Sequence, residues 1–371
     1  MDSRDEFTFR TTDLDPGSDA ALGADYTMLW EGSAARCPFQ SPAILGWFNR
    51  SIRDRARLFA LRDDRGMQAA VVLRQDASGG LSFLSDLKTD VNRFLFHREL
   101  EEGGKRAFFI GLLRTVIAEG RTLTLNSQLG DHPDTALLLA IVKEQGMWAT
   151  VVDNSACPVL EAASPEELFA QVDAQRELRY RVNKLRNQKQ AEFEVFTDQV
   201  DLETWTADFQ QAHISRWEGT DTPSRFRDLE RRQFLLGCLQ AWAANGLLVR
   251  FSVRTKDGRT GFVIGLRAPG TLIHHSTTYH PCHAKFSPGK ALLHTMAGWM
   301  RDNGLRILDF GDGREPYKYS VATSERPLQR IFIGRRSDLR FRASSSMIRM
   351  VRGNQLLYGM YQRHLKRRWR S

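Results

Sequence analysis

The feature that most constrains the fold is the order of elements predicted between Gly246 and Gly311. β-Rich runs on either side of Asp257-Gly258, a pair that favours a tight hairpin, predict two antiparallel strands. A turn then leads into a third strand, and a helix and a short buried strand follow. The predicted ranges are strands at 247–255, 260–266 and 271–279, a helix at about 288–303 and a strand at 305–310.

The first half of the chain repeats this order, although no repeat is visible at the level of residues. The predicted ranges there are strands at 57–61, 68–73 and 81–84, a helix at about 98–119, a strand at 122–126, a helix at about 133–145 and a strand at 148–152. Because 371 residues exceed what one hydrophobic core usually supports, two domains are expected. We therefore predict an α/β (α+β) fold with two similar units at 1–160 and 161–335, each a mixed, mostly antiparallel sheet flanked by helices, and a basic helical tail at 336–371.

A long helix is predicted between the two units, from Pro165 to about Gln190. Ser164 followed by Glu167 is a capping-box pattern at its start. Its second half carries six cations: Arg176, Arg179, Arg181, Lys184, Arg186 and Lys189. Two interpretations stay open: the cations line a cleft for an anionic substrate, or they form a solvated face next to the acidic segment 192–203.

The net charge of +9 is concentrated in the tail. Residues 335–371 hold ten Arg and one Lys against one Asp, so the rest of the chain is close to neutral. Apolar side chains from Met347 to Tyr361 lie among these arginines, as in an amphipathic helix at a membrane surface. The tail is expected either to contact anionic lipid, RNA or an acidic partner, or to pack on the protein as an ordinary helix.

Composition and cysteine spacing favour a cytoplasmic protein. No run of about 18 apolar residues is present, and Met1–Asp15 lacks the pattern of a secretory signal. The four cysteines show no paired spacing, so neither a metal site nor a disulfide framework is predicted. Cys282, flanked by His280 and His283, is the one cysteine to test as a nucleophile.

Two segments carry the candidate chemistry, and the first is Phe286-Ser287-Pro288-Gly289-Lys290. Ser287 is expected to cap the helix that starts at Pro288, and Gly289 leaves main-chain amides open to a phosphate. Lys290 adds a positive charge. Ser-Pro also starts many helices that bind nothing, so an ordinary helix start is the alternative.

The second segment runs from Leu308 to Tyr319 and follows the last predicted strand. It contains glycines, acids, cations and two phenols, which suit a polar pocket better than a packed core. A solvated Gly-Asp turn is the alternative. We expect both segments to face the same pocket, because both follow strands of one sheet.

These segments together resemble the BioF2-like (CelD-type) acetyltransferase family of the GNAT superfamily. The resemblance is carried by Ser287-Pro288-Gly289 before a helix and by the run from Asp309 to Lys318. Arg216-Trp217, and Ser41-Pro42 with Trp47, also look like landmarks of that family. The resemblance covers about residues 30–335, and the family is similar in architecture to the Fem aminoacyltransferases, which hold two GNAT-like units on one chain.

The resemblance implies transfer of an acyl group from acetyl-CoA or another acyl-CoA to an amine or hydroxyl, on a small-molecule or glycan acceptor of polysaccharide or cell-envelope synthesis. In GNAT enzymes main-chain amides hold the pyrophosphate, and the corresponding loop here is His283–Lys290. Ser-Pro-Gly replaces the usual glycine-rich loop there. The first unit's helix opens with acids at 99–104, unsuited to phosphate, so that unit is expected to be degenerate and the second unit to bind the cofactor.

The candidate bases in the second unit are Asp309, Glu315 and a histidine of the third strand. Strand alternation would put His274 and His280 on one face of the sheet and His275 on the other. His280 is therefore a candidate for catalysis, and His274 for contact with the substrate. No single residue among these is singled out as the base.

The remaining candidates act on the leaving group or hold the acceptor. Tyr317 is a candidate general acid, and Lys318 or Arg314 would hold an anionic acceptor or a carbonyl oxygen. Arg216 and Trp217 would form a wall of the acceptor cleft.

Two other functions stay open. The first is Fem-like transfer of an aminoacyl group from tRNA, with the cationic helix and the tail as contact surface; nucleic acid is not otherwise expected as a partner. The second is a non-catalytic scaffold, held at the inner face of the cell membrane by the tail.

Overall fold

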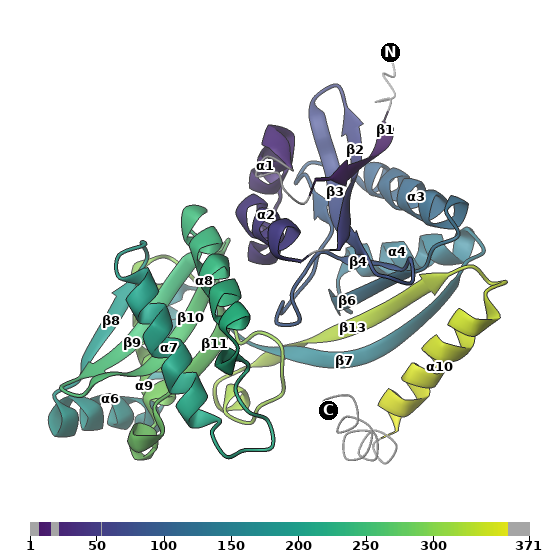
Figure 1. Cartoon of the computed structure of the whole chain (residues 1–371). Coiled ribbons are helices and arrows are strands. Elements are labelled where there is room, and N and C mark those ends of the chain that lie inside the picture. The colour runs from purple at the N-terminus through teal and green to yellow at the C-terminus, as the bar shows by residue number, and fades with distance from the viewer. Residues whose placement is uncertain (1–6, 16–21, 53, 355–371) are drawn as a thin grey trace. The chain divides into compact units, whose positions relative to one another are not determined.

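The structure is a computed structural model that describes residues 7–15, 22–52 and 54–354 (Figure 1). These residues form two units, each with its own hydrophobic core. The N-terminal unit takes the chain up to Ala156 and again from Arg326, and the C-terminal unit takes Cys157–Glu325. Within the described ranges, no helix combines the length and the apolar character needed to span a membrane.

The N-terminal unit is a sheet with helices on both faces. Its elements are β1 (Thr8–Leu14), α1 (Gly23–Gly32), α2 (Pro42–Ser51), β2 (Arg55–Asp63), β3 (Gly66–Gln75), β4 (Leu81–Phe83), β5 (Leu95–Phe96), α3 (Glu102–Ala118), β6 (Leu123–Leu129), α4 (Pro133–Glu144), the first part of β7 (Trp148–Glu161), β13 (Ser324–Gly334) and α10 (Leu339–Gly353). The strand order is β1-β2-β3-β4-β6-β13-β7, with β5 paired to β3. Helices α3 and α4 cover one face, and α1 and α2 lie on the other (Figure 1).

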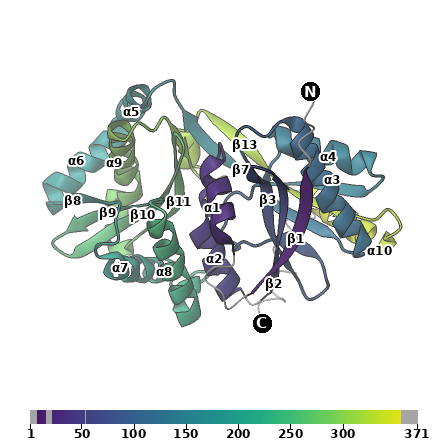
Figure 2. The same cartoon turned by 90° about the horizontal axis from the view of Figure 1, so that it is seen from above.

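The C-terminal unit repeats this plan in shortened form. Its elements are the end of β7, α5 (Pro165–Asp173), α6 (Arg176–Lys189), β8 (Glu192–Phe196), α7 (Leu202–Arg216), α8 (Leu229–Ala244), β9 (Leu248–Thr255), β10 (Gly258–Ala268), β11 (Thr271–Tyr279), the short helix η3 (Pro281–Phe286), α9 (Pro288–Asp302) and β12 (Ile307–Asp309). The strand order is β7-β12-β11-β10-β9-β8. Figure 2 shows α5, α6 and α9 on one face of this sheet and α7 and α8 on the other.

The order predicted from the sequence, three strands, a helix and a strand, is confirmed in both units. In the first unit it is β2, β3, β4, α3 and β6, with the two-residue strand β5 added before α3, and in the second it is β9, β10, β11, α9 and β12. In each unit the third strand of this order and the strand after the helix are parallel neighbours, β4 with β6 and β11 with β12. The two units are therefore structural repeats although their residues do not match.

The single helix predicted from Pro165 to Gln190 is wrong, because the chain breaks it into α5 and α6. Gln175 leaves the helical region (ψ 98°), and its side chain donates a hydrogen bond to the Ser320 carbonyl (3.0 Å). The break lets both helices bury apolar faces in one core. The capping box is confirmed, since the Ser164 hydroxyl accepts from the Glu167 N–H (3.1 Å).

The described part of the basic tail is α10, which packs on the N-terminal unit. Ser345 is buried and its hydroxyl lies 3.0 Å from that of Thr150, on β7. Arg342 lies over the Trp148 ring, 4.5 Å from its centre. Met347 and Met350 on the same helix are exposed. The rest of the predicted tail, 355–371, lies outside the described residues.

Candidate active site

A cavity of about 270 Å³ lies in the C-terminal unit, where β11 and β12 separate. The two strands pair only from Thr271↔Ile307 to Ile273↔Asp309, and β11 continues to Tyr279 while β12 ends. The lining residues are Arg216, His274, Thr277, Tyr279, Ala284, Ser287, Gly289, Lys290, Leu293, Phe310, Tyr317 and Ser320. The start of α9 and the segment after β12 therefore face one cavity, as predicted.

An irregularity in β11 decides which of its side chains reach this cavity. The pairing of β11 with β10 shifts between Ser276 and His274, so His275 is an extra residue in the strand, a β-bulge. Beyond the bulge, Thr277 and Tyr279 join His274 at the cavity, where strict alternation would have placed Ser276. The His275 ring lies on the other side, 5.3 Å from that of Trp242.

The prediction that His280 shares a face with His274 is wrong because of this bulge. His280 does not line the cavity. Its Nδ1 lies 3.0 Å from the sulfur of Cys282, which is exposed. The geometry therefore gives no support to His280 as the base or to Cys282 as a nucleophile of this site.

The start of α9 differs from the predicted phosphate cradle. Ser287 is in the left-handed region (φ 53°), and its side chain makes no capping bond, so the predicted cap is wrong. The N–H groups of Lys290 and Ala291 both donate to the Ser287 carbonyl (3.0 and 3.3 Å), and Pro288 has none. Gly289 is left as the one amide here without an acceptor in the described part of the chain. A single free N–H group cannot form the predicted phosphate site, which needs several main-chain amides that point at one ligand.

Positive side chains lie at the cavity and near the start of α9. Lys290 lines the cavity, and its ammonium binds both carboxylate oxygens of Glu177 at 2.8 Å. The hydrogen bond from Lys290, followed by that from Arg181, holds the pKa of Glu177 below its usual value. Arg216 lies 4.3 Å from the centre of the Tyr279 ring and donates to the Thr277 carbonyl (3.5 Å).

More cations gather beside Phe286, a buried residue just before α9. The ammonium groups of Lys184, Lys189 and Lys285 lie 5.3–5.4 Å from the centre of its ring. Two of these three belong to α6, so part of the cationic face of that helix lies next to the start of α9. None of the six cations of α6 lines the cavity, so both interpretations of the cationic helix stay open.

Three residues of the second segment have structural contacts in place of the predicted catalytic roles. Lys318 is 4% exposed, and its ammonium donates to the carbonyls of residues 311, 312 and 313 (3.4, 2.8 and 3.3 Å). Glu315 pairs with Lys318 (2.9 Å). Buried Asp309 accepts a hydrogen bond from the Gly311 N–H (2.9 Å). None of the three lines the cavity, because they fold the loop on itself.

The remaining predicted site residues also differ in whether they line the cavity. Tyr317 lines the cavity, with its ring centre 6.2 Å from that of His274. Arg314 points to Glu325 (3.5 Å), and Trp217 lies at the end of α7, outside the lining. Thr277, Tyr279 and Phe310 also line the cavity and were not among the predicted site residues; the β-rich run before His280 was the signal that could have found the first two.

Comparison with known proteins defines the class of this site. Residues 173–319 match the model of a family described as an acetyltransferase (GNAT) domain. These residues include all of the cavity lining except one, Ser320. The C-terminal unit therefore contains a GNAT-type acetyltransferase domain.

Solved structures resemble the chain as a whole. FemX is 10% identical, with 90% of this chain and 100% of that chain covered and a TM-score of 0.60. The C-terminal domain of a putative lysylphosphatidylglycerol synthetase from Agrobacterium fabrum is 10% identical (90% and 96% covered, TM-score 0.56). At these identities the likeness concerns the fold alone. No curated protein matches the sequence. The chain has the predicted tandem GNAT-like fold.

Proposed function

We propose that the C-terminal unit transfers an acyl group from acyl-CoA to an amine or hydroxyl acceptor at the cavity beside β11. The observation that carries this proposal is that one cavity joins the start of α9 to an imidazole and a phenol, His274 and Tyr317, inside the stretch that matches an acetyltransferase domain.

The side chains of this cavity suit attack on a thioester. The acceptor must lose a proton, and the departing sulfur must gain one. His274 is 5% exposed and lies on strand β11, which suits a base, and Tyr317 on the segment after β12 suits an acid. The guanidinium of Arg216 supplies positive charge for the oxyanion that develops.

The residues around the cavity fit an anionic donor. Ala284, Leu293 and Phe310 give an apolar wall for a short acyl chain. The cations next to Phe286 suit the phosphates of CoA, which would then be held by side chains more than by main-chain amides. A BioF2-like specificity, with a polysaccharide or cell-envelope acceptor, and a cytoplasmic location rest on the sequence resemblance and stay predictions.

A second candidate is transfer of an aminoacyl group from tRNA. Two observations favour it: the fold is similar to that of FemX, and the cationic side chains of α6 lie next to the start of α9. Phosphates of tRNA and of CoA would use the same cations, so the donor must be identified by binding. Binding of tRNA would weaken steeply with salt, because each neutralised phosphate releases counterions.

The substitution Gly289→Val tests the site. A side chain at this position would point at Thr277, with its Cβ 3.8 Å from the Thr277 hydroxyl, so valine narrows the cavity. The backbone of Gly289 is not left-handed, and the helix accepts a side chain there. We expect the affinity for acetyl-CoA, measured by isothermal titration calorimetry, to fall about tenfold or more, which corresponds to about 1.4 kcal/mol.

The matched control is Gly103→Val. Gly103 is the second residue of α3, as Gly289 is of α9, and a side chain there meets no atom within 4 Å. The control should bind acetyl-CoA like the wild type. If wild-type protein neither binds acetyl-CoA nor releases CoA with a panel of amines and sugars, the acyl-CoA proposal is wrong. Salt-sensitive binding of tRNA in that case would favour the second candidate.

A further inference from the structure

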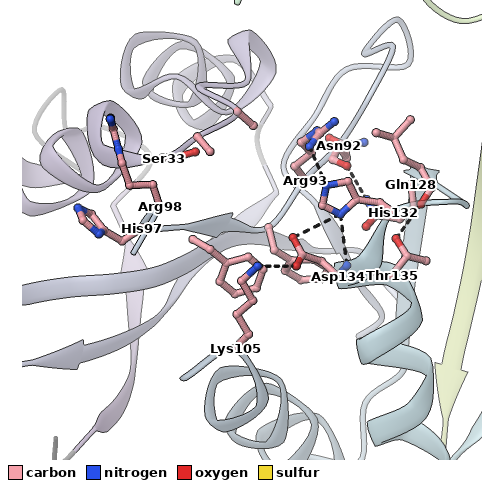
Figure 3. Close-up of a pocket in the computed structure, with 15 residues that line it drawn as sticks. Ser33, Asn92, Arg93, His97, Arg98, Lys105, Gln128, His132, Asp134 and Thr135 are labelled. Carbon is pink, nitrogen blue, oxygen red and sulfur yellow. Dashed lines mark hydrogen bonds and ion pairs between the residues drawn. The ribbon is translucent and has the colours of Figure 1, made fainter. Parts of the chain in front are cut away.

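The N-terminal unit has a cavity of its own, of about 230 Å³ (Figure 3). Its lining residues are Ser33, Ala34, Ala35, Asn92, Arg93, Phe94, Phe96, His97, Arg98, Lys105, Gln128, Leu129, His132, Asp134 and Thr135. The parallel pairing of β4 with β6 is confined to Leu81↔Leu123 and Ser82↔Thr124. Lining residues come from the ends of β5 and β6 and from the starts of α3 and α4, so the cavity occupies the same place in this repeat as the candidate active site does in the other.

A buried polar network fixes one wall of this cavity. The Gln128 side chain, 3% exposed, donates to the Asn92 carbonyl (2.7 Å). The Asn92 side chain accepts from Gln40 (3.2 Å), and the Thr135 hydroxyl donates to the Leu129 carbonyl (2.8 Å). Because these bonds tie strand ends to the start of α4, the wall is shaped before any ligand arrives.

Four polar side chains form a chain across the cavity. The Lys105 ammonium binds Asp134 Oδ1 (2.9 Å), and Asp134 Oδ2 lies 3.4 Å from His132 Nδ1. On the other side, Arg93 Nη1 lies 3.3 Å from His132 Nε2. Figure 3 shows His132 between Asp134 and Arg93, with Lys105 approaching Asp134 from below.

This chain leaves positive charge in the cavity wall. Arg93, Arg98 and Lys105 are three cations, and Asp134 is the one carboxylate in the lining. Arg93 makes no ion pair with any carboxylate of the described residues. Burial, and next the charge of Arg93, hold the pKa of His132 below its usual value, so at neutral pH the imidazole is uncharged and neither repels nor neutralises a ligand.

The other residues that line the cavity indicate which kind of anion fits it. Phe94, Phe96 and Leu129 give apolar surface. Helix α3 starts with Glu101 and Glu102, whose carboxylates oppose a pyrophosphate there. A small anion held by side chains fits this cavity, and a coenzyme held at the start of the helix does not.

We propose that this cavity binds a small organic anion, a carboxylate or a phosphate ester, with its charged group between Arg93 and Lys105 and its apolar part against Phe94 and Phe96. The N-terminal unit is thus a second binding site with its own chemistry. The proposal does not depend on the acyl-transfer function.

Calorimetric titration of the full chain at low salt with benzoate and with phenyl phosphate tests this proposal. We expect at least one probe to bind. The probe with the higher affinity shows whether the cavity prefers a carboxylate or a phosphate ester. Arg93→Gln removes the charge and keeps a donor for His132, so it should weaken binding at least tenfold. The matched control is Arg106→Gln: Arg106 follows Lys105 on α3 but pairs with exposed Glu144 (2.5 Å), outside the lining, and its loss should leave binding unchanged.

A second variant keeps the proposal testable if Arg93→Gln does not fold. Ala34 is exposed at the rim of the cavity, and Ala34→Glu adds a repelling carboxylate without disturbing the core. It should also weaken binding, with an unchanged urea midpoint. If neither probe binds at about 1 mM, the upper end of typical KM values, or if the wild type and both variants bind equally, the proposal is overturned.

Discussion

Lys318 illustrates how a charged side chain in a polar segment can serve the fold. Its ammonium is buried and satisfied by three main-chain carbonyls and by Glu315. These bonds hold the loop after β12, and this loop carries Tyr317 to the cavity. Lys318 therefore positions the site without touching it.

We predict that Lys318→Met destabilises the C-terminal unit by about 2–3 kcal/mol, because three main-chain carbonyls, that of buried Gly311 among them, lose their donor. Urea unfolding measures the change. The matched variant is Lys290→Met, which breaks an ion pair of the same type with Glu177, but at the surface. That loss should cost less than about 1 kcal/mol. Equal effects of the two substitutions would mean that the carbonyl contacts of Lys318 add nothing to stability.

Single residues also mark the limit of prediction from sequence. Ser287-Pro288-Gly289 was found because helix starts have a local signature. The bulge at His275 was not found, because it arises from the pairing of β11 with β10, which no local pattern records. One extra residue changed which side chains face the cavity, so Tyr279 was missed and His280 was chosen wrongly.

At the scale of elements, a group of charges joins strands β8, β9 and β10 at the edge of the C-terminal sheet. Glu194 on β8 receives hydrogen bonds from Arg254 (2.5 Å), Arg259 (2.8 Å) and the Ser252 hydroxyl (2.6 Å). Burial alone would raise the pKa of Glu194, but these bonds outweigh it, with that from Arg259 foremost, and hold the pKa below the usual value. The edge strand is therefore held by an ionised carboxylate.

This lowered pKa predicts how stability depends on pH. The stabilisation from Glu194 is fully present above the unfolded pKa of about 4.3 and is lost as the pH falls through the lower, folded-state pKa. Glu194→Gln should lower the unfolding free energy by about 1–3 kcal/mol at pH 7 and make its acid decline shallower.

Urea unfolding at pH 7 and near pH 3 checks this prediction. The control is Glu192→Gln, at an exposed position of the same strand without an ion pair among the described residues, and it should change stability by less than about 0.5 kcal/mol. A deficit in Glu194→Gln that is as large at pH 3 as at pH 7 would contradict the assignment to an ionised carboxylate.

Elements with local signals were predicted, and those that depend on distant contacts were not. The Asp257-Gly258 hairpin follows from its turn residues, and α9 follows from Pro288 at its first position and Gly304 just after its end. The division of one helix at Gln175 depends on a contact with Ser320, far along the chain. Strand β13 was missed because its neighbour β6 lies about 200 residues earlier in sequence, beyond any local pattern.

At the scale of the whole molecule, the two cores predict two separable unfolding steps. Leu112→Ala removes a fully buried side chain of α3, and Leu292→Ala does the same in α9. Each should cost about 2–5 kcal/mol in its own unit. In differential scanning calorimetry, Leu112→Ala should shift one unfolding transition and Leu292→Ala the other. Leu112→Ala should also leave the binding of acetyl-CoA unchanged. A single transition moved alike by both would contradict independent units.

The strand order also sets the timing of assembly on the ribosome. Strand β13 fills the gap between β6 and β7, yet all of Cys157–Glu325 is translated before most of it. At about 5–20 residues per second, the strands made first wait roughly ten to forty seconds for this partner. The later unit can close while the earlier one still exposes unpaired strand edges. The N-terminal strands, which are synthesised first, are therefore the part of the nascent chain that most needs a chaperone.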